Sequence, residues 1–505
     1  MTPDGAALLD YHRQTALRPG EAWLAVEPWN RPRPFKLYED LESLRLPPVP
    51  SAEAHGPEPA GEPPIDAPML ASLPHWSAGI TRRRRLPDGT VMPFRAASCT
   101  GALYHIETYA VCAELPGLPA GVYHYALQNE TARRLRPGDW RASLLAAGGA
   151  DAGLAAAPLA LVLSSEFWRN AWRYGERAYR HAFWDAGTIL ANLLALGGAY
   201  GLPTRVITAF DDAAVNVLLG LDGVGEAALA VVALGGGAPI LPTTTPPEPI
   251  APRVAPSSPR PRTPPAIAAA HVASSLAGSE HVVSWRAAAA AFNAAGAPQA
   301  EPAVSEGGLS SLPAVSACSD PVEAIIVRRG SARRFSEESI SVEALAAVCR
   351  AAAAVPGGDA WPAGAPLAET LLVVQAAAGI APGVYRLRGE TTLELLAAGE
   401  RRNQVASLVP DARRAGAAAV TIWWLADGER VLSRLGGRGY RVVQLDAGLA
   451  LGRLYLAATA AGLGATGLTF FDDEAAGFFA SWSPRRQVVL AAAVGRTAPR
   501  STPAG

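Results

Sequence analysis

The sequence predicts two copies of one domain of the α+β or α/β class, in which helices cover a sheet. Two observations lead to this prediction. Strand-length apolar runs are mixed with long helical segments in both halves of the chain, a pattern typical of sheets covered by helices. A long stretch of the first half also recurs in the second half, and a repeat of this length is a whole domain rather than a solenoid unit.

The repeat keeps one spacing across its strongest matches. Its two copies read ERAYRHAFWDAG and GRGYRVVQLDAG, and each copy ends downstream in a pair of aspartates. All matched positions differ by 261 residues (440 − 179 = 446 − 185 = 472 − 211), so we expect no insertion between them. A fused pair suggests relatives that work as two-fold dimers, with a site built between the halves. The matched positions are Tyr179 and Tyr440, Asp185 and Asp446, and Asp211-Asp212 and Asp472-Asp473.

Four segments follow one another along the 505 residues. The first segment, residues 1–66, is rich in Pro, which excludes a long helix there. Its aromatic residues favour an arm packed on the protein over a disordered tail. The third is dense in Pro, Ser and Thr, which indicates a semi-extended connector before an Ala-rich helix. The segments are the arm (1–66), which precedes the first repeat, domain one (67–237), the Pro- and Ala-rich linker with its helix (238–318), and domain two (319–497).

Apolar runs place the main elements within the two domains. We expect a long helix to begin at or near Asp185 and another at or near Asp446, because a carboxylate at a helix start favours the helix dipole. The remaining expected elements are strands from Leu159, Ala228, Thr370, Ala418 and Gln487, and a helix over residues 342–354.

Composition excludes several classes of function. With 44 basic and 45 acidic residues, the chain shows no sign of a nucleic-acid or anionic-membrane partner. The N-terminus lacks a basic stretch followed by an apolar core, and the apolar runs near Ile189 and Val420 are too short or too broken to span a bilayer. We therefore expect a cytoplasmic protein. Its cysteines have no metal-ligand spacing and are expected to be small buried hydrophobes: Cys99, Cys112, Cys318 and Cys349.

A first candidate binding element is RRGSARRF, residues 328–335. Arg329, Ser331 and Arg333 supply two guanidinium groups and a hydroxyl within five residues, which suits a phosphate. Taken alone, the octet also fits a solvated basic turn before a helix.

A second candidate is RAASCTGALYHIETY, residues 95–109. Small residues precede an alternating strand, so the backbone could press its N–H groups against a flat ligand, although an ordinary loop would look the same. His105 and Glu107 share one strand face, but two ligands without a third make a poor metal site, and no metal is expected. The loop consists of Ser98, Cys99, Thr100 and Gly101.

Together, in this order, these blocks resemble the nitroreductase-like flavoprotein superfamily. Within it the chain is similar to the FMN-dependent azoline dehydrogenases of thiazole- and oxazole-modified peptide pathways, the streptolysin- and microcin-type oxidases. The resemblance covers nearly the whole chain, and it implies an α+β fold of two tandem nitroreductase-like domains, each with a central antiparallel or mixed sheet, that form an internal pseudo-dimer. The blocks that carry it are YHRQT, PWNRPRPFKLY, GITRR, RAASCTGALYHIETY, LPAGVYHY and RYGERAYRHAFWDAG in the first half, and RRGSARRF, APGVYRL, RGYRVVQLDAG and AAAVGR in the second.

The resemblance implies FMN in an interface, with the phosphate held by one subunit and the flavin ring covered by a loop of the other. Domain two keeps the phosphate element but has lost the loop, whereas domain one keeps the loop and lacks a clear Arg-x-Ser-x-Arg. We therefore expect one intact composite FMN site and one dead site. The implied cofactor-binding residues are Arg329, Ser331, Arg333, Arg496 and Gly467 from domain two and Ser98, Cys99, Thr100 and Gly101 from domain one.

The branch also carries a Lys-Tyr pair before the repeat block, which here reads Arg173-Tyr174. Arg keeps the positive charge, which would ease deprotonation of Tyr174, but cannot itself act as a base. Tyr174 is thus the expected base, supported by Arg173, although a tyrosine there could equally be a core or surface aromatic. Asp185 and Asp446 are expected to be structural.

The resemblance implies dehydrogenation of thiazolines or oxazolines on a precursor peptide, in an antibiotic-type, thiopeptide-like pathway with a cyclodehydratase partner. Two alternatives stay open. One is a nitro- or quinone-reductase that uses NAD(P)H, and the other is a non-catalytic docking subunit of a peptide-modifying complex. Loss of half the motifs from each copy would also fit such a scaffold.

Overall fold

The computed structural model describes residues 2–21, 25–52, 63–85, 89, 91–294, 308–316, 318–361 and 364–498. Its described part contains two seven-stranded sheets of identical strand order, each antiparallel throughout. This confirms the tandem α+β architecture. In order across each sheet the strands are β1 (Ser43–Arg45), β6 (Thr131–Pro137), β5 (Gly121–Ala126), β4 (Ile106–Cys112), β7 (Leu159–Glu166), β9 (Glu226–Leu234) and β8 (Thr204–Ile207), and then β10 (Leu309–Ser311), β13 (Thr392–Ala398), β12 (Gly383–Arg388), β11 (Glu369–Val374), β14 (Val420–Ala426), β16 (Gln487–Gly495) and β15 (Gly464–Leu468).

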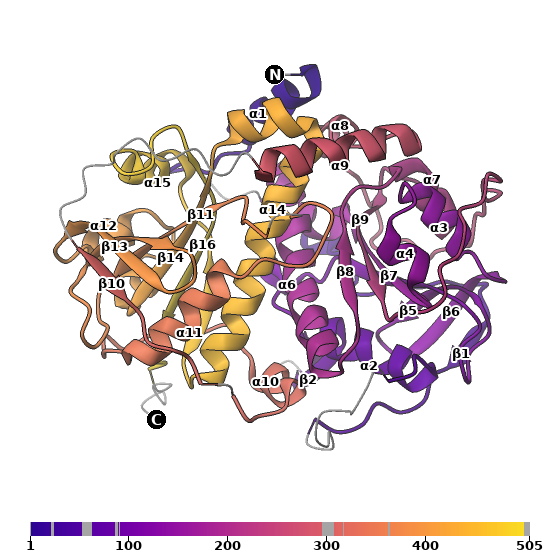
Figure 1. The fold of residues 1–505 in the computed structure, drawn as a ribbon, viewed down its shortest axis with the longest axis horizontal. Helices are drawn as coiled ribbons and strands as arrows, with labels where there is room; N and C mark the ends of the chain where they lie inside the picture. The colour runs from indigo at the N-terminus through magenta and orange to yellow at the C-terminus, as the bar shows by residue number, and fades with distance from the viewer. Residues whose placement is uncertain are drawn as a thin grey trace.

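Helices cover the sheets and fill the space between them (Figure 1). A separate two-stranded hairpin, β2 (Ile80–Arg85) with β3 (Val91–Arg95), leads into the loop that begins at Ser98. The helices of the first half are α1 (Pro3–Gln14), α2 (Ala67–Ala78), α3 (Arg141–Ala147), α4 (Ala152–Ala156), α5 (Phe167–Tyr174), α6 (Ala178–Ala199) and α7 (Asp212–Leu219). Those that follow are α8 (Pro265–Ala273), α9 (Gly278–Ala294), α10 (Val322–Arg328), α11 (Val342–Ala353), α12 (Arg402–Ser407), α13 (Ala412–Ala417), α14 (Gly428–Ala460) and α15 (Asp472–Phe479).

The long helices α6 and α14 lie side by side at the centre, between the two sheets (Figure 1). They do not begin where the sequence suggested. Asp185 lies inside α6 and Asp446 lies inside α14, so neither carboxylate is at a helix start. The chain instead breaks at Gly175 and Gly436, both with φ near +56° (56° and 57°), where glycine avoids the strain that a side chain would impose. The helical stretch Phe167–Ala199 is long and apolar enough for a membrane span by length and composition, contrary to expectation, but 78% of its most apolar window is buried inside the protein.

Four arginines and two aspartates join the halves around these helices. Arg177 and Arg180 at the start of α6 bind Asp472 of α15, with N–O distances of 2.7 and 2.6 Å. In the same way Arg438 and Arg441 of α14 bind Asp212 of α7. Asp212 is thus the counterpart of Asp472, an offset of 260 rather than 261. The uniform alignment of the paired aspartates was wrong by one residue, because domain two has one residue fewer before α15.

The repeat extends further toward the N-terminus than the sequence suggested. Just after α1, the Leu17 N–H donates to Asp472 Oδ2 at 2.8 Å. Just after α8, the Leu276 N–H donates in the same way to Asp212 Oδ2 at 2.8 Å. The chain after α1, which precedes domain one, thus contacts domain two, and the chain after α8, which precedes domain two, contacts domain one. α1 is therefore the counterpart of α8. Strands β1 and β10 likewise complete the sheets although they lie outside residues 67–237 and 319–497.

The arm packs on the protein, as expected, and its later part contacts domain one. Lys36 and Tyr38 are buried, and Lys36 Nζ lies 2.6 Å from Glu226 Oε2. The linker follows the arm, because Tyr38 pairs with Val254. Trp29 is 55% exposed, and Trp23 lies outside the described residues. The expectation that all four cysteines are buried was wrong for two of them, because Cys318 is exposed and Cys99 is half-buried.

Candidate functional site

The predicted phosphate element lies directly after α10 and beside strand β15. Ser331 forms a β-bridge with Ala465, so the element runs along the strand that ends the second sheet. The Ser331 hydroxyl lies 3.0 Å from the hydroxyl of Tyr455, and the same Tyr455 oxygen accepts the Gly467 N–H at 2.9 Å. The structure thus brings Ser331 and Gly467 together through Tyr455, which sequence reasoning missed.

Arg329 of domain two reaches the backbone of domain one. Its Nε donates to the Ala96 carbonyl at 3.0 Å and a terminal nitrogen donates to the Arg95 carbonyl at 2.9 Å. The guanidinium also lies over the Tyr455 ring, 5.6 Å from its centroid. Because Ala96 precedes the Ser98 loop by two residues, elements of both halves meet at this point.

The two other basic residues of the set are placed differently. The Arg333 side chain is exposed at the surface. Arg496 donates from Nε to the Ser339 carbonyl at 3.2 Å and lies 3.8 Å from Glu338, while its own carbonyl accepts the Ser336 N–H. The backbone of Arg496 therefore adjoins the phosphate element, but its side chain is directed to Glu338.

Asp185 organises the domain-one loop. Both its carboxylate oxygens accept the Thr100 N–H, at 3.0 and 2.9 Å, and one accepts the Thr100 hydroxyl at 2.9 Å. The Cys99 thiol lies 3.1 Å and His105 Nε2 lies 2.9 Å from the same carboxylate. Thr188 of α6 adds a hydrogen bond to the Ser98 carbonyl at 2.8 Å. Asp185 is structural as expected, but it acts by holding this loop rather than by capping a helix.

Cys99, His105 and Asp185 place one possible metal-ligand atom each within 4.8 Å of the others. The sequence suggested Glu107 as the partner of His105 and did not indicate Cys99 and Asp185 as its neighbours. Glu107 instead forms ion pairs with His124 and Arg169. Burial, followed by the charge of Asp185, raises the pKa of the Cys99 thiol well above its usual value. The neutral thiol donates a hydrogen bond to Asp185.

Tyr174 closes the outer side of the loop. A Cβ added to Gly101 would lie 2.8 Å from the Tyr174 hydroxyl, and Gly101 has φ +65°, so both space and backbone favour glycine there. The Arg173 guanidinium lies 5.8 Å from the Tyr174 ring centroid. Burial raises the pKa of Tyr174, and the charge of Arg173 lowers it only in part. The expectation that Arg173 eases deprotonation is right in direction, but burial outweighs it.

The counterpart position in the other half is filled. There the domain-two loop docks directly on β8: the Val206 N–H donates to the Gly357 carbonyl at 3.0 Å, and the Asp359 N–H returns to the Val206 carbonyl at 3.2 Å. The Asp359 carboxylate accepts N–H groups of Thr208 and Ala209 and the Thr208 hydroxyl, each at 2.8 Å. We call each place where a loop of one half meets the edge strand of the other half a crossing. Val206 is the equivalent of Gly467 (467 − 206 = 261), so the two crossings are unequal.

The fold and this interface define a protein built from two sheets around a pseudo-two-fold helix pair, in which the two contact regions between the halves differ. The chain belongs to the nitroreductase family, whose model matches residues 64–236 and 326–496.

Two solved structures illustrate the likeness. One is from Anabaena variabilis and is described as a nitroreductase. It is 23% identical, with a TM-score of 0.78 over 97% of this chain and 99% of that one. The other is the microcin synthetase McbBCD complex of E. coli with truncated pro-MccB17, 21% identical, with a TM-score of 0.30 over 46% of this chain and 94% of that one.

A curated relative from Methanocaldococcus jannaschii, also described as a nitroreductase, is 25% identical over 126 residues. The match covers 25% of this chain and 64% of that relative's length.

Proposed function

We propose that this protein is an FMN-dependent oxidoreductase with one composite cofactor site between its halves. Arg329, Ser331 and Arg333 bind the phosphate, and the Arg496 guanidinium joins them when it leaves Glu338. Gly467 borders the ring on the domain-two side. The domain-one loop of Ser98, Cys99, Thr100 and Gly101 covers the other face.

The residues present fit this cofactor. Arg329 contacts domain-one backbone while Ser331 lies beside β15, which supports phosphate and ring contacts from different halves. The Gly467 N–H and the Ser331 hydroxyl both contact the Tyr455 hydroxyl, and the Ser331 hydroxyl can rotate toward an incoming acceptor. The observation that carries the single-site proposal is the closure of the other crossing by Asp359.

The reaction we propose is the dehydrogenation of peptide-borne thiazolines or oxazolines to thiazoles or oxazoles. Bound FMN would supply the hydride acceptor for this two-electron oxidation, with dioxygen as the terminal oxidant. Tyr174 takes the ring proton, and the Gly101 loop holds the peptide ring beside it. The Arg173-Tyr174 pair at the position of the Lys-Tyr pair supports this reaction. The substrate is a precursor peptide, and a cyclodehydratase is the partner that supplies it.

One observation favours a second candidate, reduction of nitro compounds or quinones by NAD(P)H. Because burial raises the pKa of Tyr174, its resting form is protonated. A protonated tyrosine is a proton donor to a reduced product, whereas dehydrogenation needs the phenolate.

Flavin content and flavin bleaching test these proposals. We expect one FMN per chain, with weaker FMN binding in Ser331→Ala and unchanged binding in the control Asp359→Asn at the closed crossing. Two FMN per chain would contradict the single site, and a colourless protein that still binds partner enzymes would select the docking subunit. Anaerobic bleaching by an azoline peptide supports the dehydrogenase, and bleaching by NADPH supports the reductase.

A further inference from the structure

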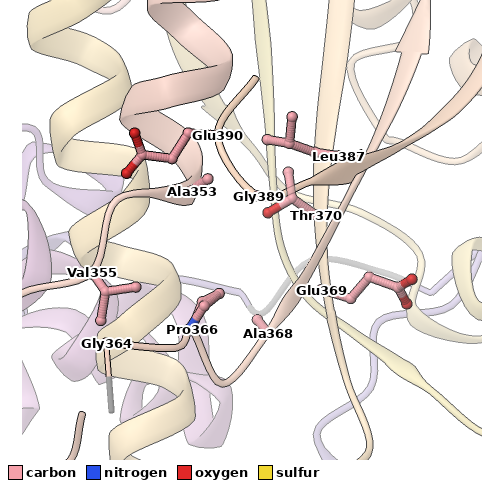
Figure 2. A pocket seen from close by; sticks show the side chains of 10 residues that line it. All are labelled: Ala353, Val355, Gly364, Pro366, Ala368, Glu369, Thr370, Leu387, Gly389 and Glu390. Carbon is pink, nitrogen blue, oxygen red and sulfur yellow. The ribbon is translucent and has the colours of Figure 1, made fainter. Parts of the chain in front are cut away.

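Domain two contains a cavity of about 360 Å³ between the end of α11, strands β11 and β12, and the segment that precedes β11 (Figure 2). This volume is within the range of small-molecule sites in proteins, about 300–1,000 Å³. It is separate from the composite site, since no lining residue belongs to the phosphate element or the domain-one loop. Its apolar wall consists of Ala353, Val355, Pro366, Ala368 and Leu387.

The same place in domain one is lined by larger side chains. The paired strands fix the equivalence: Tyr109 pairs with His124 and Leu371 with Arg386, each 262 residues apart (371 − 109 = 386 − 124). A small cavity of about 10 Å³ borders this place, with Tyr104 and Ile106 in its wall together with Ser98, Cys99 and Asp185.

Side-chain size explains the difference between the halves. At the equivalent backbone positions domain one carries larger residues, and two of them are phenols. The replacements from domain one to domain two are Tyr104 to Pro366, Ile106 to Ala368, and Tyr125 to Leu387. The side-chain volume missing from domain two therefore includes two aromatic rings.

The charged side chains that line the cavity are carboxylates. None of the described residues that line it is basic. Glu390 stands at the rim, 52% exposed, and its nearest cation, Arg350 Nε, is 3.9 Å away. Glu369 is directed away from the cavity (Figure 2) and binds Arg386 at 2.5 Å. Among the described residues no hydrogen bond engages the Thr370 hydroxyl, which also lines the cavity. A cation would complement Glu390, and an anion would be repelled.

We propose that this cavity binds a small arylalkyl ammonium ligand. The aromatic ring fills the space that Tyr104, Ile106 and Tyr125 fill in domain one. The ammonium group lies at the Glu390 carboxylate, and a ring hydroxyl or the ammonium reaches Thr370. The site is independent of FMN and of the reaction at the composite site.

Calorimetric titration with tyramine tests the proposal, with 4-hydroxyphenylacetate as the anionic probe of similar shape. We expect one tyramine site per chain and much weaker binding of the anion. Glu390→Gln should weaken tyramine about fivefold, the effect of an exposed ion pair. Ala368→Ile restores the domain-one side chain and should abolish binding.

The matched control is Glu130→Gln, because Glu130 lies in the corresponding turn of domain one, between β5 and β6, and faces His75 at 3.0 Å. It should leave tyramine binding unchanged. Equal binding of both probes would overturn the charge assignment, and full tyramine binding to the Ala368→Ile protein would place the ligand elsewhere. Absence of tyramine binding to the wild-type protein overturns the site. Unchanged melting temperature and flavin content in each variant show that the chain is folded.

Discussion

Gly187 of α6 and Gly448 of α14 face each other at the centre of the molecule. A Cβ added to Gly187 would lie 2.5 Å from the Gly448 carbonyl carbon, and one added to Gly448 would lie 2.6 Å from the Trp184 carbonyl oxygen. The two glycines are 261 residues apart (448 − 187), so each is the repeat equivalent of the other. A self-equivalent contact of this kind lies on a two-fold axis.

Gly187→Ala should strongly destabilise the protein, because its new methyl group would meet backbone that has no room to move. We expect the free energy of unfolding to fall by about 3 kcal/mol or more. Gly198→Ala is the control in the same helix, because nothing lies within 4 Å of its Cβ, and it should add about 0.5–1 kcal/mol. Denaturant titration measures both. Similar stabilities for the two variants would show that the helices do not cross at Gly187.

Asp472→Asn should lower stability because it leaves Arg177 and Arg180 buried without their shared carboxylate. The cost should be about 3–5 kcal/mol, whereas Asp473→Asn, 65% exposed, should change stability by less than about 0.5 kcal/mol. Burial opposes ionisation of Asp472, but the two arginines prevail and lower its pKa to about 2.

This pKa also predicts an acid transition. A folded-state pKa below the unfolded value, about 3.9, stabilises the fold above pH 4, and this contribution is lost as the pH falls through 2. Unfolding measured from pH 5 to pH 2 should show a decline that Asp472→Asn lacks. A parallel decline in both proteins would assign acid sensitivity to other groups.

Asp446→Asn should stabilise the protein at alkaline pH. Burial raises the pKa of Asp446 to about 6, although the Leu367 N–H works against it. The favourable contribution of the neutral acid is complete below about pH 4 and is lost as the pH rises through 6. An amide oxygen still accepts the Leu367 N–H. We expect a gain of up to about 2–3 kcal/mol at pH 8 and none at pH 4, measured by thermal unfolding. A gain at pH 4 would contradict this origin.

Tyr174→Phe should lower kcat by about 10²–10⁴-fold if the hydroxyl moves a proton. As a base it gives a rate that rises with pH throughout the alkaline range, because burial raises the pKa of Tyr174 above its ordinary value. As a donor it gives a flat profile that falls only above that pKa. The Arg173→Lys variant, which restores the Lys-Tyr pair, should retain activity. A Tyr174→Phe enzyme with normal FMN content and wild-type kcat would remove Tyr174 from the chemistry.

The repeat, the strands and the meeting of Arg329 with the Ser98 loop region could be predicted from the sequence. Apolar runs define buried strands by themselves, and the interface followed from the family resemblance, which identified one element in each copy. The helix starts could not be predicted this way. Asp185 resembled an N-terminal carboxylate, whereas its partners Thr100 and His105 lie about 80 residues upstream and come near it only in the fold.

Tyr455 was missed for a similar reason. It is one aromatic residue on an apolar helix, and only the fold brings it to Ser331 and Gly467. The deletion before Asp472 was hidden because two adjacent aspartates occur in both copies, so a shifted alignment looked perfect. The closure of the second crossing by Asp359 also left no motif, since a single carboxylate in a Gly-rich loop has no distinctive spacing.

The linker gives this pseudo-dimer a freedom that a true homodimer lacks. In a homodimer every substitution appears twice, so a change that seals one crossing seals both. Here the Asp359 loop and the Gly101 loop are encoded separately. The Asp359 loop could therefore become a fixed structural contact while the Gly101 loop kept its role in ligand binding. Dilution cannot separate the halves either, so the protein should keep its shape at concentrations where a two-chain relative would fall apart.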